Sequence, residues 1–116
     1  MAAFHDLASA RAAAAAHDVR RPLLLLTPPG GAGAAGPAYY REIIERLRAE
    51  RPDLKVSGLL DCGRDPALAH FALRAGWRDI VLGGNAAARR RIAAIAGELG
   101  ARVRSRPPKI NQMDAK

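Results

Sequence analysis

The feature of this sequence that most limits its fold is an alternation of short apolar runs with longer helical segments. The apolar runs cover residues 23–26, 56–60, 80–82 and 101–104, and the other segments have helix propensity or a helical spacing of apolar residues. Strands that are joined through helices run parallel in one sheet. The order α-β-α-β-α-β-α-β therefore predicts an α/β fold, either half of a (β/α)8 barrel or a small open doubly wound sheet.

The same pattern predicts the domain boundary. We expect one α/β domain over residues 1–106 and a mobile C-terminal tail over residues 107–116, which begins with two prolines and is otherwise polar. The expected helices cover residues 4–16, 37–50, 66–75 and 86–99. Apolar residues at helical spacing predict two buried faces, formed by Tyr40, Ile43, Ile44 and Leu47 and by Leu68, Phe71, Ala72 and Ala75.

Four parallel strands cannot close a barrel, because about eight are needed for a filled interior. Large side chains are also few, since five residues are aromatic and alanine supplies much of the apolar content. Both features leave sheet edges and core surface for a partner. We therefore expect a homo-oligomer, most simply a homodimer, or docking on a larger protein as an interaction or regulatory module.

The net charge of +8 raises the question of nucleic-acid binding. The tightest basic cluster, Arg89-Arg90-Arg91, lies in an expected helix, where three consecutive residues spread over roughly 200° of the circumference. No aromatic residue is interleaved with them to stack on bases. A solvated helix face explains this cluster better, so we do not expect nucleic acid as a partner.

The chain contains one cysteine, Cys62, which excludes an intrachain disulfide and a structural metal site built from cysteines. No segment reaches the ~18 apolar residues of a membrane span, and the first residues lack the basic and apolar regions of a signal peptide. We expect a soluble cytoplasmic protein that has no membrane contact and requires no metal or other cofactor.

Ligands of parallel α/β proteins bind beyond the carboxyl ends of the strands. In this chain those ends carry hydroxyl, carboxyl, thiol, amide and guanidinium groups together with flexible glycines. The candidate ligand-binding residues are Thr27, Gly30, Gly31, Gly33, Asp61, Cys62, Gly63, Gly84, Asn85, Arg104 and Arg106.

Residues 31–36 form a literal GxGxxG between a strand and a helix. In a dinucleotide site the glycines form the tight turn itself and the helix N-terminus meets the pyrophosphate. Here Thr27 to Gly30 intervene, and Pro37 indicates that the helix begins only after the last glycine. An ordinary loop is the better interpretation, and a nucleotide-binding domain is a weaker alternative.

Asp61 and Cys62 stand side by side where the second apolar run ends, and they are the catalytic candidates if there are any. A cysteine near a helix N-terminus or an arginine can be reactive, and Arg64 is close in sequence. A catalytic cysteine also needs a positioned base such as histidine, and all three histidines fall in expected helices. A small buried residue at a strand end is the favoured interpretation of Cys62.

Three short motifs occur in order along the chain: Leu60-Asp61-Cys62-Gly63, Ala75-Gly76-Trp77 and Gly83-Gly84-Asn85. With the flanking helices and strands, over roughly residues 7–106, they resemble the N-terminal half of class II, metal-dependent fructose- and tagatose-bisphosphate aldolases. The resemblance implies a truncated (β/α) barrel with about four of the eight strands.

The departures from the family pattern imply a lost metal centre. The family's catalytic acid corresponds to Asp61, but the neighbouring metal-binding histidine corresponds to Cys62. The acid and serine of the family's next strand-end motif correspond to Gly83 and Asn85, and a pair of glutamates corresponds to Arg104 and Arg106. Arginines in place of carboxylates reverse the local charge, so the resemblance implies a degenerate relative that holds no metal.

The same reversal predicts an anion site. Arg104 and Arg106 are two apart on the last expected strand and would share a face, where two guanidiniums can grip a phosphate or carboxylate. We expect a non-catalytic, aldolase-like half barrel that binds a small anionic metabolite or acts as an oligomeric module. The alternatives are a metal- or cysteine-dependent lyase completed across a dimer, and arginines that merely keep an edge strand soluble.

Overall fold

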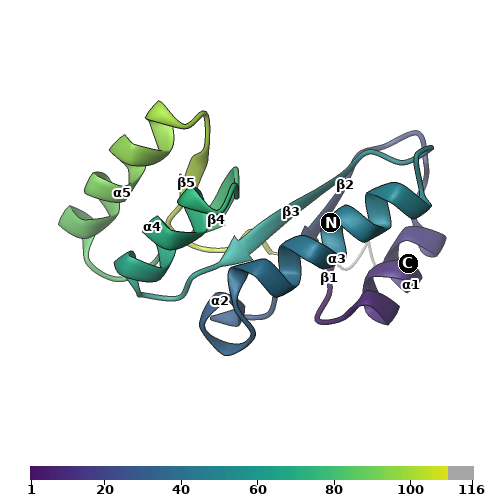
Figure 1. The fold of residues 1–116 in the computed structure, drawn as a ribbon, viewed down its shortest axis with the longest axis horizontal. Coiled ribbons are helices and arrows are strands. Elements are labelled where there is room, and N and C mark those ends of the chain that lie inside the picture. The colour runs from purple at the N-terminus through teal and green to yellow at the C-terminus, as the bar shows by residue number, and fades with distance from the viewer. Residues whose placement is uncertain (110–116) are drawn as a thin grey trace.

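The structure is a computed structural model that describes residues 1–109. Five parallel strands form one open sheet, and helices connect them (Figure 1). The strands are β1 (Ala2–Ala3), β2 (Leu23–Leu26), β3 (Val56–Asp61), β4 (Asp79–Val81) and β5 (Arg102–Arg104). The helices are α1 (Leu7–Ala16), α2 (Gly31–Ala34), α3 (Pro37–Glu50), α4 (Pro66–Arg74) and α5 (Ala86–Glu98). The predicted α/β fold is confirmed, and the expected tail lies mostly outside the described residues.

The strand order across the sheet is β1-β2-β3-β4-β5, the same as the order in the sequence. A doubly wound sheet reverses its strand order part-way across, whereas right-handed crossovers that advance in one direction put every helix on the same face. Buried residues of all five helices accordingly join one core cluster with Leu25, Leu60 and Ile80 of the sheet. Of the two expected forms, the structure matches the half barrel.

A strand at the very start of the chain was not expected. Ala2 and Ala3 pair with Leu25 and Leu26, and the backbone N–H of Phe4 donates to the carbonyl of Leu26 at 3.0 Å. The first helix was predicted from Phe4, which is wrong, because Asp6 caps it and it begins at Leu7. The Asp6 carboxylate accepts from the Ser9 N–H at 2.7 Å, a capping interaction that fixes this start.

The two predicted helix faces have different outcomes. In α3, Tyr40, Ile43, Ile44 and Leu47 are all buried, as expected. In α4, Phe71 is 61% exposed, and the buried residues are Ala69, Ala72 and Leu73. Both sets have helical spacing because alanines occur on either face of α4, so periodicity alone could not choose between them. The expected burial of Phe71 is wrong.

Strand β3 joins two parts of the sheet. Its residues Val56 to Leu59 pair with β2, whereas only Leu60 and Asp61 pair with β4. The first four residues of β3 therefore have no β4 residue beside them, and the sheet is split at this point. Figure 1 shows β3 as the long strand between two groups of helices. Helices α1 and α3 lie side by side at one end of the molecule, and α4 and α5 lie side by side at the other.

The second face of the sheet carries a smaller apolar cluster of Leu26, Leu59 and Val81. Among residues 1–109 no helix contributes to this cluster. Asp61 lies on the same face, since it pairs with Val81 and alternates with Leu60.

No helix of the described part of the chain is long and apolar enough to cross a membrane.

Candidate functional site

The loops that follow the strands meet at the carboxyl end of the sheet. The Gly83 N–H donates to the carbonyl of Gly63 at 2.8 Å, which joins the loops after β3 and β4. A β-carbon at Gly83 would lie 3.7 Å from the carbonyl oxygen of Ser105, so the segment after β5 is adjacent as well. We call this region, formed by residues 27–33, 61–64, 83–85 and 104–106, the strand-end rim.

Asp61 ties the rim together. Its Oδ1 accepts hydrogen bonds from the backbone N–H groups of Gly30 at 3.1 Å and Gly63 at 2.8 Å. Its own N–H donates to Oγ1 of Thr27 at 2.9 Å, and both side chains are buried. These contacts join the loops after β2 and β3. One carboxylate oxygen of the candidate catalytic acid therefore serves as a structural acceptor.

Backbone amides of the glycine loop also form hydrogen bonds within the loop. The N–H groups of Gly31 and Gly33 donate to the carbonyls of Pro28 and Gly30 at 2.8 and 3.0 Å, and the loop contains the four-residue helix α2. Helix α3 begins after the last glycine with Pro37 in its first turn, as the sequence indicates. The amides of Gly31 and Gly33 are thus engaged within the loop, and the amide of Gly30 is engaged by Asp61.

Cys62 points to the opposite face from Asp61. It belongs to the main core, is 1% exposed, and its thiol faces the carbonyl of Leu60 at 3.9 Å. Burial raises the pKa of this thiol to about 12, and the negative charges of Asp61 and Asp65 add to the effect. The sulfur is therefore a neutral thiol directed away from the rim.

Gly84 and Asn85 lie at the start of α5. The Asn85 side chain caps the helix by accepting from the Ala88 N–H at 3.0 Å. The Arg64 side chain packs on Gly84, where a β-carbon would lie 3.3 Å from Cβ of Arg64, and Nη1 of Arg89 donates to the Gly84 carbonyl at 3.4 Å. Two arginines therefore flank Gly84. In the sequence, Arg64 was considered beside Cys62 and Arg89 within the basic helix cluster, but neither was placed among the ligand-binding candidates.

The expectation that Arg104 and Arg106 lie on one strand is wrong. Strand β5 ends at Arg104, so Arg106 lies beyond it and the alternation of a strand does not place the two on one face. Arg104 forms a two-bond ion pair with Asp79 at 3.0 and 2.7 Å, and this carboxylate keeps the pKa of the guanidinium above its ordinary value. Arg106 is exposed.

The positive charge is concentrated in the second half of the chain. Residues 64–109 carry ten Arg and Lys side chains against three Asp and Glu, whereas residues 1–63 carry eight against seven. Arginines are scattered throughout, as the sequence interpretation noted, but the acids that neutralise them are mostly in the first half. The loops after β3, β4 and β5 therefore lie in a strongly basic part of the protein.

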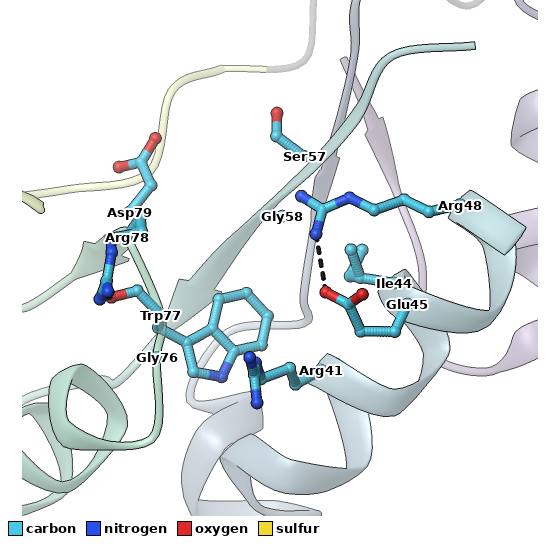
Figure 2. Close-up of a pocket in the computed structure, with 10 residues that line it drawn as sticks. All are labelled: Arg41, Ile44, Glu45, Arg48, Ser57, Gly58, Gly76, Trp77, Arg78 and Asp79. Atoms are coloured by element: carbon cyan, nitrogen blue, oxygen red, sulfur yellow. Dashed lines mark hydrogen bonds and ion pairs between the residues drawn. The ribbon is translucent and has the colours of Figure 1, made fainter. Parts of the chain in front are cut away.

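A cavity of about 190 Å³ lies at the split in the sheet, at the opposite end of the strands from the rim. Figure 2 shows its lining, which comes from α3 on one side and from the segment before β4 on the other. The lining residues are Arg41, Ile44, Glu45, Arg48, Ser57, Gly58, Gly76, Trp77, Arg78 and Asp79.

Sequence reasoning missed this cavity, although Gly58 was a signal. A glycine inside a strand often marks a close approach of another group, and here a β-carbon would lie 2.9 Å from Cζ3 of Trp77.

Within residues 1–109 no three His, Cys, Asp or Glu side chains group in a way that would hold a metal ion. Comparisons of the chain with models of known protein families and with curated proteins find no match. The assignment of a function therefore depends on the geometry of the rim and the cavity.

Proposed function

We propose that this protein binds a small phosphate- or carboxylate-bearing metabolite at the strand-end rim without chemically converting it. The observation that carries this proposal is the pair of arginines at Gly84. Arg64 packs on this glycine and Arg89 bonds to its carbonyl, at the N-terminus of the 13-residue helix α5. The Arg89 guanidinium lies beside a helix N-terminus and the aliphatic stem of Arg64 packs on the same glycine, which together provide a favourable environment for an oxyanion.

The surrounding charge supports this proposal. Arg64 and Arg89 form no ion pair within residues 1–109, and the segment that contains them has a large excess of basic side chains. Arg106, which belongs to the rim, adds a further exposed cation. This excess of positive charge therefore attracts anions that come within about one Debye length of this part of the protein.

The absence of turnover is proposed from the state of Asp61 and Cys62. One oxygen of the Asp61 carboxylate holds two backbone amides, and the Cys62 thiol is buried on the other face of the sheet. A lyase that uses both residues needs them on the same side, so this alternative fits the geometry less well. The aldolase-like ancestry is likewise a proposal, supported by the sequential parallel sheet with its helices on one face.

Thermal-shift measurements with inorganic phosphate and sugar phosphates test the binding. We expect the melting temperature to rise with phosphate concentration, and Arg64→Gln and Arg89→Gln to raise the half-saturating concentration about tenfold each, as the loss of one charge-assisted hydrogen bond predicts. Arg90→Gln, which removes an exposed arginine beside Arg89, is the control. An equal loss of phosphate affinity in all three variants would contradict the proposal, as would a melting temperature that no anion changes.

Self-association is the second candidate function, and the open sheet favours it. Strands β1 and β5 stand at the two edges, and five strands are fewer than the eight of a filled barrel. A homodimer that covers an edge is the simplest arrangement. Size-exclusion chromatography with light scattering tests it, and a monomer at every concentration would count against it.

Cytoplasmic residence is also proposed, because a buried free cysteine suits a reducing compartment.

A further inference from the structure

The cavity at the split in the sheet has a rigid apolar wall. The Trp77 side chain is 5% exposed, and its Nε1 donates to the carbonyl of Pro37 at 3.1 Å, which fixes the orientation of the indole. The indole edge and Ile44 both approach Gly58, which has no side chain to separate them. The wall is therefore built before any ligand arrives.

The charges around the cavity are only partly compensated. Glu45 pairs with Arg48 at 2.7 Å, Arg48 also donates to the Val56 carbonyl, and Asp79 pairs with Arg104. Arg41 and Arg78 have no acidic partner among residues 1–109. Nη1 of Arg78 donates to the Trp77 carbonyl at 3.5 Å, so two guanidiniums without a carboxylate partner remain at the edge of the small cavity.

Arg41 packs against a second glycine of the cavity lining. A β-carbon at Gly76 would lie 3.2 Å from Cζ and Nη2 of Arg41, so the guanidinium lies directly on this glycine. Gly76 also has a φ of +105°, a conformation that other residues rarely adopt. Figure 2 shows the Arg41 side chain beside the indole of Trp77.

We propose that this cavity binds a small organic monocarboxylate with a flat apolar body, such as an aromatic acid. The flat body would pack against Trp77 and Ile44, and the carboxylate would accept hydrogen bonds from Arg41 and Arg78. The volume of about 190 Å³ is below the ~300 Å³ of common ligand pockets and limits the ligand to about one ring. This site is separate from the rim and does not depend on the proposed function.

Trp77 is the only tryptophan, so its fluorescence reports directly on the cavity. Titration of the full chain with benzoate is expected to change the emission saturably. Benzamide, which has the same shape without the charge, is expected to bind at least tenfold more weakly, and inorganic phosphate is expected to leave the emission unchanged. Equal responses to benzoate and benzamide, a phosphate response as strong as that of benzoate, or no saturable benzoate response would each overturn the proposal.

Variants identify the residues involved. Arg41→Gln and Arg78→Gln are expected to weaken benzoate binding about tenfold each. Arg46→Gln, on the same helix but outside the cavity, is expected to bind benzoate like the wild type. Arg41→Lys keeps the charge but loses the fork, and an intermediate loss is expected. Arg64→Gln, a substitution at the rim, should leave benzoate binding unaltered. Benzoate binding that is unchanged in Arg41→Gln and Arg78→Gln would overturn the assignment of the cavity.

Discussion

The carboxylate of Asp61 accepts a hydrogen bond from the backbone N–H of Gly30, which precedes it by 31 residues. The same oxygen holds the Gly63 N–H, so one side chain orders the loops after two neighbouring strands. The position that the aldolase resemblance assigns to catalysis therefore contributes to the rigidity of the rim.

Replacement of Asp61 should cost stability. Asp61→Ala leaves two amides without their acceptor, and we expect the free energy of unfolding to fall by about 2–3 kcal/mol. Asp61→Asn keeps an oxygen acceptor and should lose less. Urea denaturation at constant m-value measures both. Glu42→Ala removes an exposed acid as the control, and an Asp61→Ala protein as stable as this control would contradict the assigned role.

Cys62 should make stability fall at high pH. Its folded-state pKa is raised to about 12 from an ordinary value of 9.0, so the folded protein holds the thiol proton more tightly than the unfolded chain. The stabilising effect is complete below pH 9 and is lost as the pH rises towards 12. The wild type should therefore lose stability relative to Cys62→Ala as the pH rises from 9 towards 12. Urea unfolding of both proteins at pH 7 and at pH 10 would show this difference.

A thiol reagent provides an independent check on Cys62. Native protein at neutral pH should react slowly, and unfolded protein should react at the rate of a free cysteine, because only the thiolate attacks. Rapid reaction of the native protein would show that the thiol is accessible and would reopen a catalytic role.

Gly58→Ala should disturb the split in the sheet. The added methyl would lie 2.9 Å from Trp77 and 3.1 Å from Ile44, so we expect a loss of about 1–3 kcal/mol and a change in tryptophan emission. Gly97→Ala is the matched control, since no atom lies within 4 Å of its β-carbon and it sits in α5. The control should gain about 0.5–1 kcal/mol. Unchanged emission in Gly58→Ala would contradict the packing described for Trp77.

Two substitutions in α4 test which face of this helix is buried. Leu73→Ala should cost about 2–5 kcal/mol because it opens space in the core, whereas Phe71→Ala should change stability by less than about 0.5 kcal/mol. The opposite ranking would restore the face expected from periodicity. Thermal or urea unfolding of the two variants is sufficient.

The sequence predicted most of the local structure of this protein. The spacing in residues 40–47 and the proline at 37 predicted a helix that the structure contains, because these signals act within one or two turns. Predictions failed where two local solutions were equally good. Phe71 and Leu73 both offer an apolar face to an alanine-rich helix, and the two-residue strand β1 is too short to give a pattern.

The candidate site was predicted in location more than in composition. The loops at the strand ends do meet, as parallel topology requires, but the groups named there mainly bind one another. The common location of Arg64 and Arg89 at Gly84 was missed because nothing in the spacing of two arginines 25 residues apart indicates a common neighbour.

By itself, then, the sequence determined the alternation of helices and strands and hence the parallel sheet, since these follow from propensities and periodicities over short distances along the chain. Only the tertiary structure decided that Asp61 holds two loops and that β3 separates from β4 to leave a cavity beside Trp77. Each of these outcomes depends on contacts between residues that are distant in sequence, and such contacts exist only once the sheet has formed.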